Sequence, residues 1–233
     1  MKGLYRLAEL NIEIDSLCPD VHNLCADYRA EGFADFSVQT TGADIAFERE
    51  RGSGLSVSDG YLETLAVYRK IAEMLPYHDA VLIHGSCVAV DGAAYLFTAK
   101  SGTGKSTHTR LWRELLGERA VMVNDDKPLL RITESGVTVY GTPWNGKHRL
   151  GANIAAPLKA LCLLERAAEN SIVPVTVPEA YPMLLQQVYR PADPAALEKT
   201  LHLIDRLAAS VKLYRLGCNM EPEAAEVAYA GMK

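Results

Sequence analysis

The stretch AKSGTGKST, residues 99–107, combines the residue types of a phosphate-binding loop. Gly102 and Gly104 permit a tight turn in which backbone N–H groups converge on phosphate oxygens, and a helix that begins there adds the positive end of its dipole. Lys105 is then positioned for the β- and γ-phosphates, and the Ser106 hydroxyl for Mg²⁺. We therefore expect a site for ATP and Mg²⁺. The residues expected to bind the nucleotide are Ser101, Gly102, Thr103, Gly104, Lys105, Ser106 and Thr107.

The first position of this GxxxxGK[ST] motif is occupied by Ala99 instead of glycine. Alanine costs little at a position with negative φ, so we expect a change of loop shape without loss of binding. The alternative is a glycine-rich turn that holds no ligand. An apolar strand before the loop and an amphipathic helix after it favour the nucleotide site.

Two adjacent carboxylates, Asp125 and Asp126, follow the apolar run AVMVN downstream of the loop. A Mg²⁺-nucleotide site needs a carboxylate at the end of a neighbouring strand. Two acids can divide the work, one serving the metal and the other accepting a proton from an attacking hydroxyl. Spacing does not settle the division, although Ser106 and Asp125 are the expected metal ligands. The alternative is a solvated loop with two capping acids.

His84 is a candidate because of a predicted hairpin. Asp91-Gly92 separates two strand-like runs, and Asp-Gly is typical of a two-residue type I′ turn. This register places His84 opposite Ala99, at the mouth of the loop. There it would contact the transferred phosphate or orient an aspartate; a lone strand histidine is otherwise structural. The expected catalytic residues are Asp125, Asp126, His84 and Lys105.

Cations for a substrate anion are expected in the loop TPWNGKHRLG, residues 142–151. Its Gly, Pro and Asn content marks a connection between elements. Lys147, His148 and Arg149 could steady a substrate or the charge that develops on the γ-phosphate. Arg190 is a further candidate of the same kind. A solvated turn is the alternative.

Composition excludes several classes of protein. The 233 residues carry 24 Lys and Arg against 29 Asp and Glu, a net charge of −5, which argues against a nucleic-acid binder. Charged residues near the amino terminus argue against a signal peptide, and no long apolar run predicts a membrane span, so we expect a cytoplasmic protein. The five cysteines are expected to be reduced, and Cys18, His22 and Cys25 to pack in a core rather than bind metal.

The hydrophobic pattern predicts an α/β fold in two parts. Residues 1–78 are expected to form an amino-terminal subdomain packed on a core of residues 79–233, which ends in helices. The expected strands are 5–14, 34–40, 43–50, 81–90, 93–99, 120–126, 129–132, 137–141, 158–165 and 211–216. The expected helices are 20–30, 63–75, 105–117, 179–188, 194–208 and 222–230.

The hairpin with His84-Gly85, the loop AKSGTGKST and the strand that ends in Asp125-Asp126 resemble the catalytic domain of HPr kinase/phosphorylase. That family shares its nucleotide fold with phosphoenolpyruvate carboxykinase, so the resemblance implies a P-loop core with a mixed sheet. It spans about residues 80–165. Lys100 and Thr107 stand where HPr kinases usually have acidic residues, and SGTGKST is closer to the carboxykinase loop.

The resemblance implies a stand-alone relative that transfers the γ-phosphoryl group of ATP to a hydroxyl, with an aspartate as the general base. The acceptor is a serine of a protein or peptide, or a small-molecule alcohol, and is not inherited from the family. HPr kinases assemble into hexamers, but the sequence marks no such surface, and phosphorylase activity is also left open. The alternatives are a nucleotide-dependent NTPase or switch, and a non-catalytic nucleotide-binding module.

Overall fold

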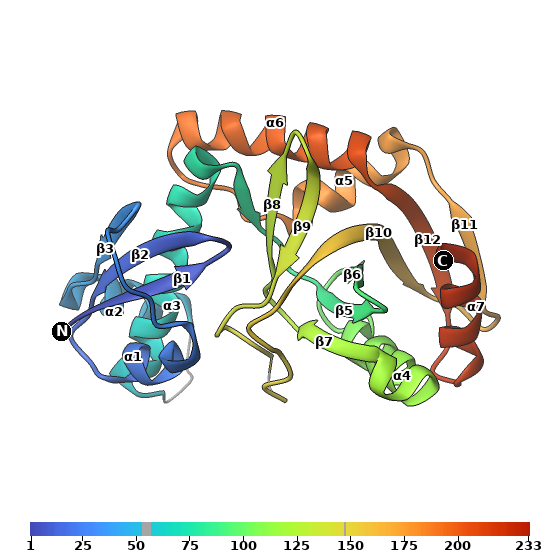
Figure 1. Cartoon of the computed structure of the whole chain (residues 1–233), viewed down its shortest axis with the longest axis horizontal. Helices are drawn as coiled ribbons and strands as arrows, with labels where there is room; N and C mark the ends of the chain where they lie inside the picture. Colours follow the sequence, from blue (N-terminus) through green and yellow to red (C-terminus); the bar gives the residue numbers. More distant parts are fainter. Residues whose placement is uncertain (53–56, 147) are drawn as a thin grey trace.

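The protein has a mixed α/β fold, seen in a computed structural model that describes residues 1–52, 57–146 and 148–233 (Figure 1). Two sheets are present in these residues. The small one has the strand order β1-β2-β3, and the large one is a curled mixed sheet that begins β4-β8-β9-β10-β6-β5-β7. Strand β12 pairs with β10 on a branch of the large sheet, and β11 pairs with β12.

The small sheet begins with a hairpin where one strand was expected. Strands β1 (Lys2–Leu7) and β2 (Leu10–Asp15) pair antiparallel, and β3 (Phe36–Gln39) lies parallel to β2. The prediction of one strand over 5–14 was wrong because Ala8 and Glu9 turn the chain with φ of 50° and 65°. Neither residue type is a turn signal, so the alternation of β1 continues into β2 without a visible break.

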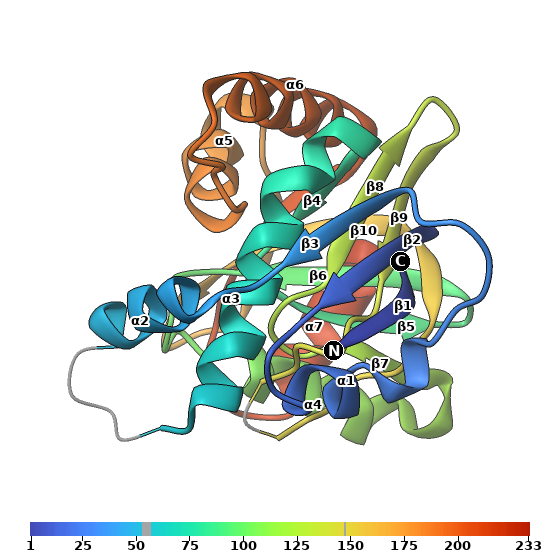
Figure 2. The same ribbon diagram turned by 90° about the vertical axis from the view of Figure 1, so that its left-hand side faces the viewer.

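The strand predicted for residues 43–50 was also wrong, because helix α2 (Gly42–Arg51) forms there. Thr41 and Asp44 make reciprocal side-chain and backbone hydrogen bonds, which form a capping box at its start. Helix α1 (Asp20–Leu24) is shorter than expected, whereas α3 (Asp59–Met74) contains all of the predicted helix 63–75 except Leu75. Figure 2 shows the small sheet from outside, with α3 running past it.

Residues 81–90 form two strands instead of one. Strand β4 (Ala80–Leu82) pairs with β8, whereas β5 (Ser86–Val90) pairs with β6 and β7. The chain leaves the first pairing at His84, whose N–H donates to the carbonyl of Gln187. The predicted two-residue turn is confirmed, since Val90 pairs with Ala93 across Asp91-Gly92. The ladder extends only to Ser86 and Phe97, so His84 is not paired with Ala99.

The candidate loop joins a buried strand to a helix. Strand β6 (Ala93–Thr98) lies inside the sheet between β5 and β10, and helix α4 (Lys105–Leu116) begins as the loop ends. Leu111 and Trp112 anchor α4 in a core with Phe97 of β6. Gly117, with φ of 57°, stops the helix as predicted.

The remaining elements follow the predicted order, with one strand that was not expected. Strands β7 (Ala120–Asn124), β8 (Leu129–Thr133), β9 (Gly136–Tyr140), β10 (Ala155–Arg166) and β12 (Lys212–Cys218) match predicted strands, and β11 (Ser171–Pro174) was missed. Helices α5 (Val177–Gln187), α6 (Pro194–Ser210) and α7 (Glu223–Met232) match predicted helices. The side chain of Asp193 caps α6 by accepting from Ala196 N–H at 2.8 Å.

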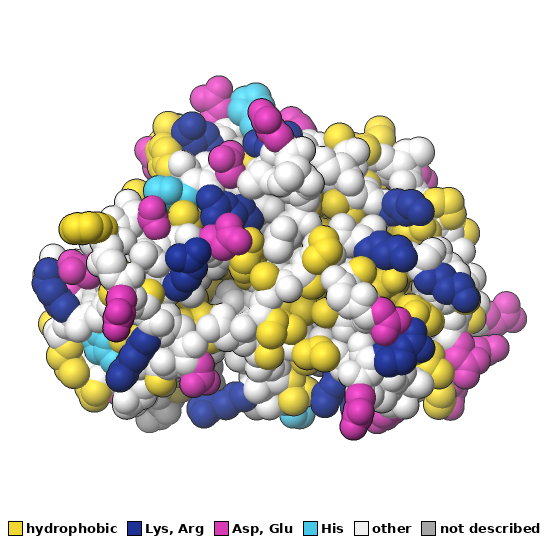
Figure 3. Space-filling model, in the orientation of Figure 1, with side chains coloured by type: hydrophobic (Ala, Val, Ile, Leu, Met, Phe, Trp, Pro, Cys, Tyr) yellow, Lys and Arg dark blue, Asp and Glu magenta, His cyan; other side chains and the backbone are white. Residues whose placement is uncertain are grey.

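Specific hydrogen bonds join α3 to the connection after β9 and to the connection after α5. Trp144 Nε1 donates to the carbonyl of Thr64 in α3 at 2.9 Å, and Tyr189 Oη donates to Glu73 at 2.7 Å. On the face shown in Figure 3, basic and acidic side chains are interspersed, without a continuous basic surface. None of the described helices is long and apolar enough to cross a bilayer.

Candidate functional site

The loop between β6 and α4 is open on its outer side. Gly102 and Gly104 adopt φ of 78° and 124°, which only glycine takes without strain. A Cβ at either position would meet no atom within 4 Å, so the space beside both backbones is free. Thr103 stabilises the turn through its N–H and hydroxyl, which donate to the Lys100 carbonyl at 3.3 and 2.9 Å. The loop is therefore shaped to present backbone N–H groups to a ligand.

A cavity of about 740 Å³ brings most of the predicted residues together, although Thr103 does not line it. The loop and the first turn of α4 form one side of it, and the residues that follow β7 form another. His84, between β4 and β5, completes the wall. The lining residues are His84, Ser101, Gly102, Gly104, Lys105, Ser106, Thr107, Thr109, Arg110, Arg113, Met122, Asp125, Asp126, Gly146, His148 and Leu150.

Lys105 supplies a buried positive charge to this cavity. Its ammonium donates to the carbonyls of Ala99 and Lys100 at 3.0 and 3.5 Å, and no ion pair to it occurs within the described residues. Burial lowers the pKa of Lys105, and the charge of Asp126 acts in the opposite direction. A cation whose hydrogen-bond acceptors are neutral carbonyls is electrostatically suited to an added anion.

Asp125 is buried, and its side chain accepts a short hydrogen bond from a backbone N–H group. Only 4% of it is exposed, and its Oδ1 accepts a hydrogen bond from Gly146 N–H at 2.7 Å. Burial raises the pKa of Asp125, and the neighbouring charge of Asp126 adds to this, while the hydrogen bond from Gly146 opposes it. The carboxylate thus lies against the cavity in a setting that disfavours its charge.

Asp126 is held between two basic side chains. Lys127 forms an ion pair with its Oδ2, and His84 Nε2 lies 3.5 Å from its Oδ1. Lys127 was not among the predicted site residues, although its position directly after the acid pair indicates that it can form an ion pair there. Asp126 therefore has in Lys127 a positive partner that Asp125 lacks within the described part of the chain.

Gln187 fixes the ring of His84. Gln187 Oε1 lies 2.7 Å from His84 Nδ1, and the Gln187 carbonyl accepts from His84 N–H at 2.8 Å. Because an amide oxygen accepts, the imidazole carries a proton on Nδ1 and turns Nε2 toward Asp126. Burial lowers the pKa of His84, as does the charge of Lys105, whereas the Gln187 contact raises it. Gln187 lies too far along the chain for sequence spacing to associate it with His84.

Asn124 positions the acid pair from the end of β7. Its Oδ1 accepts from the N–H groups of Asp126 and Lys127 at 2.8 and 2.6 Å. Its Nδ2 donates to the Thr142 hydroxyl at 3.0 Å, which connects the acid pair to the loop after β9. Asn124 was missed because its side chain acts on backbone groups, which leaves no pattern of chemistry-bearing residues.

The predicted substrate residues are only partly brought together. His148 lines the cavity, whereas Arg149 and Arg190 are exposed and do not line it. Lys147 lies outside the described residues. Arg110 and Arg113, on one face of α4, are basic residues that line the cavity and were not predicted as site residues.

Comparisons with known proteins give little beyond this geometry. No family model and no curated protein matches the chain. Among solved structures, the Hpr(Ser) kinase/phosphatase from Coxiella burnetii matches 54% of this chain and 90% of its own, with 13% identity and a TM-score of 0.30. A likeness this weak establishes neither family nor fold, so a function has to rest on the site.

Proposed function

We propose that the protein is an ATP-dependent phosphotransferase that moves the γ-phosphoryl group to a hydroxyl acceptor. The observation that carries this proposal is that the glycine-rich loop, Lys105, His84 and both aspartates line one and the same cavity. A phosphate-binding loop alone is compatible with many nucleotide-binding proteins. Its combination with two carboxylates and a histidine supports transfer chemistry, which needs a metal ligand and a proton acceptor near the phosphates.

The loop fits a triphosphate. The space beside Gly102 and Gly104 is free, and α4 directs its amino-terminal end at the same point. Lys105 meets only carbonyl oxygens, so a phosphate would replace neutral acceptors with a charged one. Arg110 and Arg113 add positive charge along the cavity.

The residues present also fit Mg²⁺. We assign the ion to Ser106 and Asp125, because Asp126 already has Lys127 as an ionic partner. The described residues contain no group of three or more His, Cys, Asp or Glu side chains arranged for a metal. This agrees with Mg²⁺, which keeps several waters and takes substrate phosphates as ligands. When bound, the ion would neutralise charge on the phosphate oxygens.

Asp126 is our candidate for the general base. Lys127 orients its carboxylate through an ion pair, His84 Nε2 lies 3.5 Å from its Oδ1, and Asn124 Oδ1 accepts from its backbone N–H. The carboxylate would accept the proton of the acceptor hydroxyl as its oxygen attacks phosphorus. Lys105 would stabilise the charge on the transferred group. Because the chemistry needs little covalent help, positioning by these residues supplies most of the catalysis.

The acceptor would enter beside His148, which lines the same cavity as the loop. Serine of a protein or peptide and a small-molecule alcohol both satisfy this chemistry. We also propose that residues 1–78 form a subdomain on a kinase core of residues 79–233. The hydrogen bonds of Thr64 and Glu73 to the larger part support such packing.

Incubation of the protein with γ-labelled ATP, Mg²⁺ and fractions of peptides or metabolites tests the proposal. We expect label in a hydroxyl-bearing acceptor, and none with the Asp126→Asn variant. Hydrolysis of ATP with no labelled acceptor would instead support an NTPase or switch. Calorimetry that detects no binding of Mg-ATP would refute the nucleotide site itself.

A further inference from the structure

A second cavity, of about 410 Å³, lies on the other side of the same loop. The ends of β10 and β12 and the connection to α7 form its outer walls. Gly102, Gly104 and Thr107 line both cavities, so the loop is the partition between them. The residues that line only the second cavity are Thr103, His108, Leu164, Arg166, Ala167, Cys218, Asn219 and Met220.

His108 is an unusual wall residue because it is 2% exposed and has an unused polar atom. Trp112 Nε1 donates to His108 Nε2 at 3.0 Å, so Nε2 carries no proton. Burial lowers the pKa of His108 to about 4, and the neutral ring must therefore hold its proton on Nδ1. Within the described residues, this buried Nδ1 has no hydrogen-bond partner.

His108 lines the second cavity, and the unpaired donor on its ring is a feature that a ligand acceptor would satisfy. The other walls suit a flat, weakly polar group. Leu164, Ala167 and Met220 are apolar, and Arg166 is fixed by hydrogen bonds to the carbonyls of Gly102 (2.5 Å) and Thr103 (3.3 Å). A planar guanidinium held in this way can stack on an aromatic ring.

We propose that the second cavity binds the heteroaromatic base of the nucleotide and that His108 selects it by donating from Nδ1 to an acceptor on the ring edge. This inference rests on the proposed function, in which the loop holds the triphosphate of the same molecule. A nucleotide that crosses the partition would place its phosphates in the larger cavity and its base in the smaller one. It would also supply the acceptor that Nδ1 lacks.

Cys218 makes occupancy of the second cavity measurable. It lines that cavity and is partly exposed, whereas Cys25, Cys87 and Cys162 are buried. Cys18 is also partly exposed but belongs to the amino-terminal part, so it is an internal control. Alkylation of both thiols can be followed by mass spectrometry in the unmodified full chain.

We expect ATP at ten times its Kd to slow alkylation of Cys218 about tenfold, with no effect on Cys18. Inorganic tripolyphosphate, which has no base, should bind without protecting Cys218. ATP binding with no protection of Cys218 would overturn the base site while leaving the proposed function intact. Absence of ATP binding by calorimetry would overturn both.

Two substitutions test the role of His108. In His108→Gln the side-chain oxygen can still accept from Trp112, but no donor remains at the position of Nδ1. We expect roughly three- to tenfold weaker ATP binding and unchanged binding of tripolyphosphate. His108→Asn keeps an N–H near Nδ1 and should retain most of the ATP affinity. Equal effects on ATP and tripolyphosphate, or none on either, would overturn the assignment, and thermal unfolding shows which variants are folded.

Discussion

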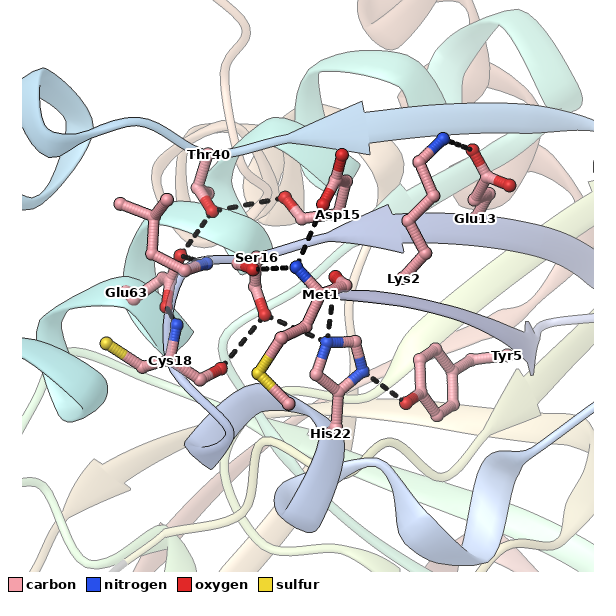
Figure 4. Close-up of polar contacts among 11 residues, drawn as sticks. Met1, Lys2, Tyr5, Glu13, Asp15, Ser16, Cys18, His22, Thr40 and Glu63 are labelled. Carbon is pink, nitrogen blue, oxygen red and sulfur yellow. Dashed lines mark hydrogen bonds and ion pairs between the residues drawn. The ribbon is translucent and has the colours of Figure 1, made fainter.

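Glu63 and Asp125 are both buried carboxylates, but their surroundings differ. Glu63, in α3, is 0% exposed and accepts three hydrogen bonds, from Leu17 N–H (2.6 Å), Cys18 N–H (2.7 Å) and the Thr40 hydroxyl (2.5 Å). Burial acts to raise the pKa of Glu63, but these hydrogen bonds outweigh it and the pKa is lowered. Figure 4 shows the closed network around this side chain.

Asp125 has the opposite balance, because burial and the charge of Asp126 outweigh its backbone hydrogen bonds, of which that from Gly146 N–H is the largest, and its pKa is raised. The histidines of the two regions differ in the same way. His22, near Glu63, has Nδ1 2.6 Å from Tyr5 Oη and Nε2 2.9 Å from Ser16 Oγ. His84 has one ring nitrogen on Gln187 and the other turned to Asp126 at the cavity.

A polar cluster alone does not mark a functional site. Where every polar atom has a partner, as around Glu63, the cluster stabilises one arrangement of the chain. Where charges are incompletely paired and border a cavity, as at Asp125 and Lys105, a ligand can supply the missing partner. The predictions that follow test this contrast.

The largest effect is expected for Lys105→Ala. Loss of the ammonium removes the charge that would stabilise the transferred phosphoryl group, and phosphotransfer should fall by about 10²–10³-fold. Lys100→Ala is the matched control, since it removes an exposed lysine from the same loop. Transfer of label from ATP measures both, and circular dichroism checks the fold. Equal activity of the two variants would contradict the role of Lys105.

Glu63→Gln should be the most damaging change to stability. A glutamine offers one acceptor oxygen instead of two and points an N–H group at another donor, so we expect a loss of about 2–4 kcal/mol in the free energy of unfolding. Asp125→Asn removes a disfavoured charge and should change it by less than about 1 kcal/mol, or increase it. Urea unfolding at neutral pH compares the two. A similar loss in both would show that Asp125 is as well satisfied as Glu63.

The two carboxylates should also give opposite pH dependences of stability. The folded-state pKa of Glu63 lies below its ordinary 4.5, so its contribution is complete above pH 4.5 and is lost as the pH falls through the folded value. The folded-state pKa of Asp125 lies above its ordinary 3.8, so its charge costs stability that is regained as the pH falls.

Urea unfolding from neutral to acidic pH measures this dependence. The deficit of Glu63→Gln relative to the wild type should shrink in acid, and any excess stability of Asp125→Asn should also shrink. A deficit of Glu63→Gln that grows in acid would contradict the sign of its pKa shift.

Lys127→Met should have a smaller effect on transfer. The ion pair with Asp126 is partly exposed, so its loss is expected to slow transfer roughly tenfold by leaving the carboxylate less well oriented. Lys127 Nζ also lies 5.9 Å from the Tyr68 ring centroid, and Lys159 makes a similar contact with Tyr95 at 6.0 Å. Lys159→Met is therefore a control that loses a lysine–aromatic contact but no carboxylate. Steady-state kinetics that slow equally in both variants would assign the effect to that contact.

Sequence periodicity predicted elements well where one signal was strong. The Asp91-Gly92 turn and the helix that begins at Lys105 are local features, and local chemistry determines them. The turn at Ala8-Glu9 was missed because the alternating pattern of the strands continues across it. Helix α2 was missed because a short polar stretch fits both the strand period and the helix period.

The same limit applies to the site. The loop is one continuous stretch of sequence and the acid pair is another, and the cavity brings the two together. Gln187 reaches His84 through packing between distant segments, which no spacing rule contains. Asn124 and the two arginines of α4 are close in sequence to the acid pair and to the loop, but the sequence does not show that Asn124 accepts from backbone N–H groups or that the arginines face the cavity. Arg149 and Arg190 failed to reach the cavity for the same reason: adjacency to a polar loop does not determine which way a side chain faces.

Ala99→Gly should have the smallest effect, although it restores the usual first residue of the loop motif. Ala99 lacks the positive φ of Gly102 and Gly104, and it packs in the core beside Trp112. Its carbonyl, which accepts from Lys105, is kept by glycine. Loss of the methyl group and added freedom of the unfolded chain should cost about 1 kcal/mol of stability, with ATP affinity unchanged within about twofold. Calorimetry that finds tenfold tighter binding in Ala99→Gly would mean that this methyl group, and not the open side of the loop, limits the fit of the phosphates.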